Sequence, residues 1–192
     1  MKNTANFLPF TLSQRLYKTL ILLIAFSGIG TAFIQAKPHL EFDGTKYYRA
    51  WEGKTEAASS VVEFLPKGQS LEHWNQMLST RIFTHLKDPD SYLREIEVTI
   101  KKSNPAANAS LYLDQHIIDF LVFSEDGRMA EFNIMKVHYI KGTGLYVQQF
   151  AKRYYNLQEK SLDDMKKLGG ELNAMRQRLI PIFYQYQFEE IE

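Results

Sequence analysis

The chain has 192 residues, 23 Lys and Arg against 22 Asp and Glu, and no cysteine. This near-neutral balance provides no concentrated positive field of the kind that nucleic-acid-binding proteins need. The lack of cysteine excludes disulfides, thiolate zinc sites and cysteine nucleophiles, so the fold must rest on packing.

The N-terminal segment predicts a secretory signal peptide over residues 1–36. It contains three basic residues and no acidic one, and an uncharged apolar run over 19–36 ends in small residues. Two cleavage positions fit this pattern, one after Ala36 and the other after Ala32. The alternative is an uncleaved inner-membrane anchor formed by 19–36, although small and polar residues dilute this run.

Cleavage after Ala36 leaves residues 37–192 as a single globular domain of 156 residues, which is long enough to bury a core. The mature domain keeps 20 basic residues against 22 acidic ones, a net charge of about −2. No cysteine follows the apolar run, which excludes a lipid attached to a cysteine at the mature N-terminus.

Two strands open the predicted domain. Residues 46–51 and 59–65 are rich in β-branched and aromatic side chains, and the polar residues between them predict a turn. Pro66 ends the second strand, and Gly68 supplies a flexible corner.

A helix is predicted after this corner, with the Ser70 hydroxyl as its N-terminal cap. Apolar residues then recur at spacings of three and four, as on one helix face: Leu71, Trp74, Leu78 and Ile82. His73 lies off this face and has no evident carboxylate to orient it. We therefore interpret Ser70 as a cap rather than as a nucleophile activated by His73.

The segment over residues 87–105 fits two structures. Ile96, Val98 and Ile100 alternate as in a strand. Tyr92, Leu93, Ile96 and Ile100 instead recur at helical spacing. Asp88 followed by Pro89 is a typical helix start. We favour a helix over about 89–102, with a strand as the alternative.

Residues 109–155 predict three or four sequential strands, which short connections should make antiparallel. The Asp-Gly pair in 125–128 and the Gly-Thr-Gly sequence in 141–144 mark two of the turns. The apolar alternation slips between Phe132 and Met135, which predicts a β-bulge.

Ser161 is predicted to cap the final helix, with two aspartates in its first turn. We expect the apolar stripe of this helix to lie on the sheet, the alternative being a coiled-coil or docking interface. Gly169 and Gly170 should weaken or bend the helix, and Pro181 should limit it near its end. The stripe consists of Met165, Leu168, Leu172, Met175, Leu179 and Ile182.

One place in the sequence brings an acid and a histidine close together. Asp114 and His116 would share one face of a strand, and His138 on a neighbouring strand would complete an acid–base or metal site. Such residues more often line a solvated sheet edge or turn. We therefore expect no catalytic residue, metal or cofactor, and keep Asp114, His116 and His138 as the alternative site.

The C-terminal third of the chain is locally basic and rich in tyrosine. A face of this kind can bind an acidic protein or an anionic envelope component such as lipid headgroups. The alternative is a solvated helix surface with half-buried tyrosines, which we favour. The candidate partner-binding residues are Lys152, Arg153, Lys166, Lys167, Tyr184 and Tyr186.

The predicted order of elements resembles the PsbP-like αβα sandwiches, a superfamily of photosystem II extrinsic subunits, a Ran-binding nuclear-import factor and bacterial envelope proteins. The points of similarity are the strand ending VVEFLPKGQ, the tryptophan-bearing helix SLEHWNQML and the strand GLYVQQFAKRYY before the last helix. They are packing features, and together they span most of residues 46–185.

The predicted elements together give an α+β fold, an αβα sandwich in which helices flank an antiparallel sheet of about five to six strands. The resemblance implies a binding or accessory protein, and no catalytic residue is carried over because the superfamily shares no catalytic set. We therefore expect an exported, non-catalytic binding or assembly protein, periplasmic or extracellular. The alternative is a secreted hydrolase that uses the aspartate–histidine group.

Overall fold

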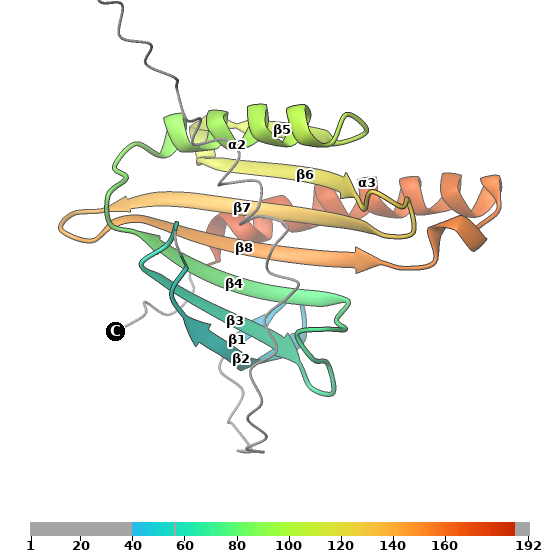
Figure 1. The fold of residues 1–192 in the computed structure, drawn as a ribbon, viewed down its shortest axis with the longest axis horizontal. Coiled ribbons are helices and arrows are strands. Elements are labelled where there is room, and N and C mark those ends of the chain that lie inside the picture. Colours follow the sequence, from blue (N-terminus) through green and yellow to red (C-terminus); the bar gives the residue numbers. More distant parts are fainter. Residues whose placement is uncertain (1–39, 56, 187–192) are drawn as a thin grey trace, which may run out of the picture.

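The computed structural model describes residues 40–55 and 57–186, which form one eight-stranded antiparallel sheet and two α-helices (Figure 1). The strand order is β1-β2-β3-β4-β8-β7-β6-β5. The strands are β1 Leu40–Phe42, β2 Thr45–Gly53, β3 Ser60–Pro66, β4 Gln76–Phe83, β5 Asn108–Tyr112, β6 Ile117–Phe123, β7 Ala130–Ile140 and β8 Gly144–Tyr154. The helices are α2 Pro89–Ser103 and α3 Leu162–Gln185, with short 3₁₀ turns η2 Leu113–Gln115 and η3 Leu157–Glu159.

The predicted α+β class and the long C-terminal helix are confirmed, but the sheet has eight strands rather than five to six. Three differences account for this number. β1 has only three residues, too few to show an alternating pattern. The prediction of three or four strands over 109–155 left open whether β5 and β6 are separate, and β4 was predicted to be helical.

The two helices cover opposite faces of the sheet. Ile117 and Ile134 pack in the hydrophobic cluster that contains the end of α3. Their neighbours in sequence, Ile118 and Met135, pack in the cluster that contains α2. Because successive strand residues point to opposite faces, the molecule has helix–sheet–helix layers.

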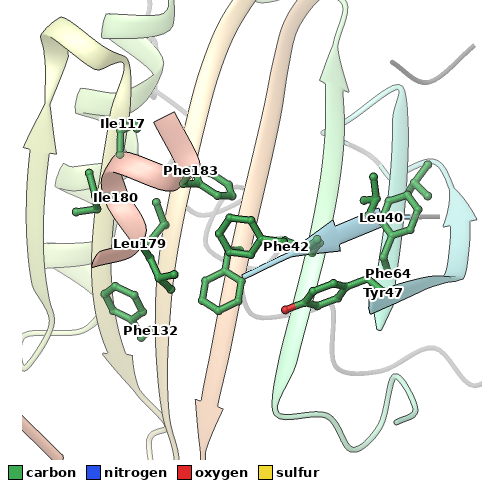
Figure 2. Packing of buried hydrophobic residues seen from close by; sticks show 13 residues of the cluster. Leu40, Phe42, Tyr47, Phe64, Ile117, Phe132, Leu179, Ile180 and Phe183 are labelled. Atoms are coloured by element: carbon green, nitrogen blue, oxygen red, sulfur yellow. The ribbon is translucent and has the colours of Figure 1, made fainter. Parts of the chain in front are cut away.

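The core on the α3 face is closed by the first strand of the sheet. Figure 2 shows the Phe42 side chain reaching from β1 toward Phe183 of α3. The ring centroid of Phe42 lies 5.5 Å from that of Phe183 and 5.3 Å from that of Phe150 on β8. Next to it, the Arg178 guanidinium of α3 donates to both carboxylate oxygens of Asp43. Strand β1 therefore attaches the C-terminal helix to the sheet.

The helix predicted from Ser70 is wrong, because residues 76–83 form β4 instead. The Ser70 Oγ accepts a hydrogen bond from the His73 backbone N–H within a short loop, and the His73 ring stacks on Tyr155 at 4.9 Å. The apolar spacing matched that of a helix because β4 is buried on both faces. Leu78 packs in the α3-face cluster and Phe83 packs in the α2-face cluster. A strand buried on both sides carries apolar residues without strict alternation.

The favoured helix over 89–102 is confirmed as α2. Asp88 caps it by accepting backbone N–H bonds from Asp90 and Ser91, and Pro89 occupies the first turn. The buried face of α2 includes Tyr92, Leu93 and residues farther along the helix. The capping pattern was therefore the more reliable part of the signal.

The strands after α2 are antiparallel, as predicted, but β7 has no bulge. Its register with both β6 and β8 is continuous from Ala130 onward. The slip in its pattern has the same cause as in β4, because β7 is buried on both faces over 132–135. The register shift that the structure shows lies in β2, between Arg49 and Trp51.

Helix α3 begins at the predicted cap, where Ser161 and Asp164 form a reciprocal capping box. Its apolar stripe is confirmed only in part. Leu168 and Leu179 are buried, but Ile182 is 39% exposed and Phe183 is buried in its place. The helix also continues through Pro181 to Gln185, and so the predicted limit is wrong.

Among the described residues, no helix combines the length and the hydrophobicity needed to cross a membrane. The predicted signal peptide and its two cleavage positions lie outside the described residues.

Candidate functional site

The predicted aspartate–histidine group is distributed over separate parts of the sheet. Asp114 lies in the 3₁₀ turn η2 rather than in a strand, and its side chain is exposed. His116 follows this turn in a left-handed conformation, with φ of 50°. Its Nε2 lies 3.4 Å from Oδ1 of Asp90, at the start of α2.

His138 belongs to the other face of the sheet. It alternates with Ile134 and Lys136 on β7, the strand positions that face α3. Its ring centroid lies 5.0 Å from that of Tyr146 on β8. The structure therefore places His116 and His138 on opposite sides. Within the described residues, no three His, Cys, Asp or Glu side chains are grouped to hold a metal ion.

The six candidate partner-binding residues also separate into two groups. Arg153 is 8% exposed, its Nε donates to Glu131 Oε2 at 2.8 Å, and its guanidinium stacks 3.8 Å from the Trp74 ring centroid. Tyr186 packs its ring edge on Phe42. Both residues therefore hold the fold together.

The other four candidates remain accessible. Lys166 and Lys167 are exposed near the start of α3, Tyr184 is 49% exposed near its end, and Lys152 is half-buried on β8. Lys166 and Tyr184 are 18 helical residues apart, which is about 27 Å at 1.5 Å per residue. One compact ligand cannot contact both ends of this set, but an extended anionic surface can.

The most concentrated polar chemistry lies inside the protein, on the α2 face of β3, β4, β8 and β7. Arg81 Nη1 donates to Gln149 Oε1 at 2.5 Å, and Gln149 Nε2 donates to Asn133 Oδ1 at 2.6 Å. All three residues are less than a tenth exposed. A chain of hydrogen bonds thus crosses three strands, β4, β8 and β7.

Glu63 is the acidic member of this group. It lies opposite Ser79 on β4 and is 2% exposed, and its Oε1 has no hydrogen-bond partner among the described atoms. Burial raises the pKa of the Glu63 carboxyl, while the charges of Arg81 and Arg153 act to lower it. Burial also raises the pKa of Tyr92, which lies on α2 near Arg81, to about 12.

A carboxyl group with a raised pKa beside a serine hydroxyl is a pairing that acid–base catalysis can use. Here, however, Glu63 and Ser79 are 2% and 1% exposed, so neither is open to a substrate in this conformation. The printed hydrogen bonds instead tie β4, β8 and β7 together, and Glu63 on β3 lies buried beside them near the charges of Arg81 and Arg153. We name the set of Glu63, Ser79, Arg81, Asn133, Gln149 and Arg153 the polar network.

A second buried charge pair attaches α3 to the opposite face. Asp119 on β6 is fully buried, and Arg176 Nε donates to its Oδ1 at 2.5 Å. Burial raises the pKa of Asp119, while the Arg176 charge and the Tyr112 hydroxyl act to lower it. Lys136 Nζ donates to the backbone carbonyl oxygens of Tyr184 and Tyr186 at 3.1 and 2.7 Å, which satisfies the end of the helix.

Neither buried group was predicted from the sequence. Arg176 lies outside the apolar stripe of the last helix, and its guanidinium reaches the sheet only through a long side chain. The polar network could not be predicted while β4 was expected to be helical. In the sequence QMLSTRIF, Ser79 and Arg81 interrupt the apolar residues of one strand face, and that interruption was the available signal.

These observations define an α+β protein with helix–sheet–helix layers. The polar network is buried inside it. A protein-family model matches residues 34–188, most of the chain, so the protein belongs to that family. This match brings no activity, ligand or partner with it. No curated protein matches the chain, and no solved structure matches it either.

Proposed function

We propose that this protein is exported and acts without catalysis, as a binding or accessory protein of the cell envelope or the extracellular space. The observation that carries the proposal is the position of the family match. The match starts at residue 34, between the two predicted cleavage positions, and the described fold starts at Leu40. The basic and apolar leader thus precedes the part that the family shares.

The use of the buried charges supports a non-catalytic role. Arg153 stacks on Trp74, Arg176 pairs with Asp119 on β6, and Lys136 donates to the end of α3, so each connects segments that are distant in sequence. The resemblance to PsbP-like sandwiches belongs to this proposal too. The helix–sheet–helix layers support that resemblance, and the β4 strand in place of the tryptophan-bearing helix counts against it.

Export is tested by fusing residues 1–40 to a phosphatase that is active only outside the cytoplasm. The proposal expects activity from the native leader. It expects none when arginines replace Leu22 and Leu23, because two charges disrupt the apolar run. An equal signal from both fusions, or none from the native leader, would contradict export.

The proposed binding partner is an anionic component, contacted through Lys152, Lys166, Lys167 and Tyr184. Protein recovered after full-chain expression should float with vesicles that contain anionic lipid and less with neutral vesicles. Replacing Lys166 and Lys167 by glutamate should abolish this difference. Lys102→Glu, exposed on α2 on the opposite face of the molecule, is the matched control and should leave it unchanged.

A further inference from the structure

Strand β5 ends the sheet, and among the described residues no strand pairs with its outer side. Its five residues, NASLY, contain no charge and no proline, and its register with β6 is continuous. An edge of this kind offers unpaired backbone groups to another strand, and proteins usually block it with lysine, proline or a bulge.

The opposite edge of the same sheet is blocked. β1 covers the start of β2, and the remaining part of β2 carries a register shift after Arg49. Arg49 and Glu52 form an exposed ion pair along this edge, with Nη1 2.6 Å from Oε2. The contrast identifies β5 as the edge that is suited to pairing.

We propose that β5 pairs with β5 of a second copy of this chain, in antiparallel orientation about a two-fold axis at Ser110. This pairing places Ala109 opposite Leu111 of the other copy and brings no like charges together. The two sheets then continue into each other across the axis.

Helix α2 is positioned to join this interface. Tyr92 packs on Phe83 of β4, so this flank of the helix faces the middle of the sheet. Asp90, on the other flank, lies beside His116 at the β5–β6 connection. Glu97 and Lys101 share the flank of Asp90 and therefore face the β5 edge.

The spacing across the axis suits a helix pair. α2 contacts β5, β6 and β7, most of all β5, and Figure 1 draws it across β5. With strands about 4.8 Å apart, the two copies of α2 would lie about 10 Å apart, the usual distance for packed helices.

The charges on this flank are complementary across the axis. The turn after α2 reverses the chain at Asn104, so β5 runs back along the helix. Ser110 lies two residues after the start of β5, which is about 7 Å along the strand. The same length along α2 reaches back about four or five residues from the end of the helix. The axis is therefore level with Thr99, midway between Glu97 and Lys101, and each copy presents its Glu97 to Lys101 of the other.

Analytical ultracentrifugation of protein recovered after full-chain expression tests the proposal. The wild type should dimerise. Glu97→Lys and Lys101→Glu should each raise the dimer dissociation constant about fivefold or more, because two symmetric attractive contacts become repulsive. An equimolar mixture of the two variants should recover dimers, since the lysine introduced at position 97 of one copy then meets the glutamate introduced at position 101 of the other.

Controls separate the interface from the stability of α2 itself. Glu97 and Lys101 also pair within one helix, so each variant is checked for folding by circular dichroism. Mixing the two variants cannot restore the ion pair within either helix. Dimers that form in the mixture therefore report contacts across the interface alone. Glu52→Lys breaks an exposed pair on the opposite edge and should leave the dimer unchanged. A monomeric wild type, or variants that dimerise equally well alone and mixed, would overturn the proposal.

Discussion

Replacing Leu179 by alanine tests how strongly α3 is held by the sheet. The Leu179 side chain is fully buried in the α3-face cluster, where Figure 2 shows it near Phe132. The change removes three carbon atoms, worth about 2.4 kcal/mol at about 0.8 kcal/mol for each buried group. The cavity left behind brings the expected loss in free energy of unfolding to about 2.5–5 kcal/mol.

Ile182 provides the matched control on the same helix. It is 39% exposed, so Ile182→Ala should cost less than about 1 kcal/mol. Urea unfolding followed by circular dichroism measures both variants, with the slope against urea as a check that the unfolding transition is unchanged. The packing described here is refuted if Leu179→Ala costs no more than Ile182→Ala.

Three further predictions use the buried charges and one turn. Arg176→Ala leaves the buried Asp119 carboxylate without its partner and should cost about 3–5 kcal/mol in urea unfolding, against about 0.5 kcal/mol or less for the exposed Lys167→Ala; equal losses would contradict the ion pair. Because burial raises the folded-state pKa of Glu63, its contribution to stability is complete below the ordinary value of 4.5 and is lost as pH rises through the folded-state value. The free energy of unfolding of Glu63→Gln should therefore increase relative to wild type between pH 4 and pH 8, and a decrease would show that the ionised form is favoured. Gly144 has a φ of 116°, and a Cβ there would collide with the Phe83 carbonyl oxygen, so Gly144→Ala should lower the thermal midpoint more than Gly142→Ala, which has a φ of 88° but open space around it; the reverse order would contradict the turn geometry.

Local signals in the sequence predicted the elements whose ends carry specific chemistry. Asp88 with Pro89 marked the start of α2, and Ser161 with Asp164 marked the start of α3, because capping depends on neighbouring residues alone. The turns at 125–128 and 141–144 were predicted for the same reason.

The elements that the sequence did not predict depend on burial from two sides. The apolar residues of β4 matched a helical spacing because both faces of this central strand are covered, which no local pattern reveals. The same cause produced the false bulge in β7. The polar network was missed with β4, since Arg81, Gln149 and Asn133 come together only in the folded sheet.

The predicted group of Asp114, His116 and His138 depended on treating Asp114 and His116 as strand residues. The 3₁₀ turn η2 and the left-handed conformation of His116 direct this histidine toward Asp90, and β7 places His138 on the other face. Side-chain direction at a turn depends on backbone angles that residue spacing does not determine.

The intact mass of the native protein tests the central claim, export with removal of the leader, most directly. Protein isolated from the envelope and extracellular fractions should have the mass of a chain that begins at Phe33 or Lys37. Recovery of the full chain from Met1, held in the membrane fraction, would contradict the claim and show that residues 19–36 act as an anchor.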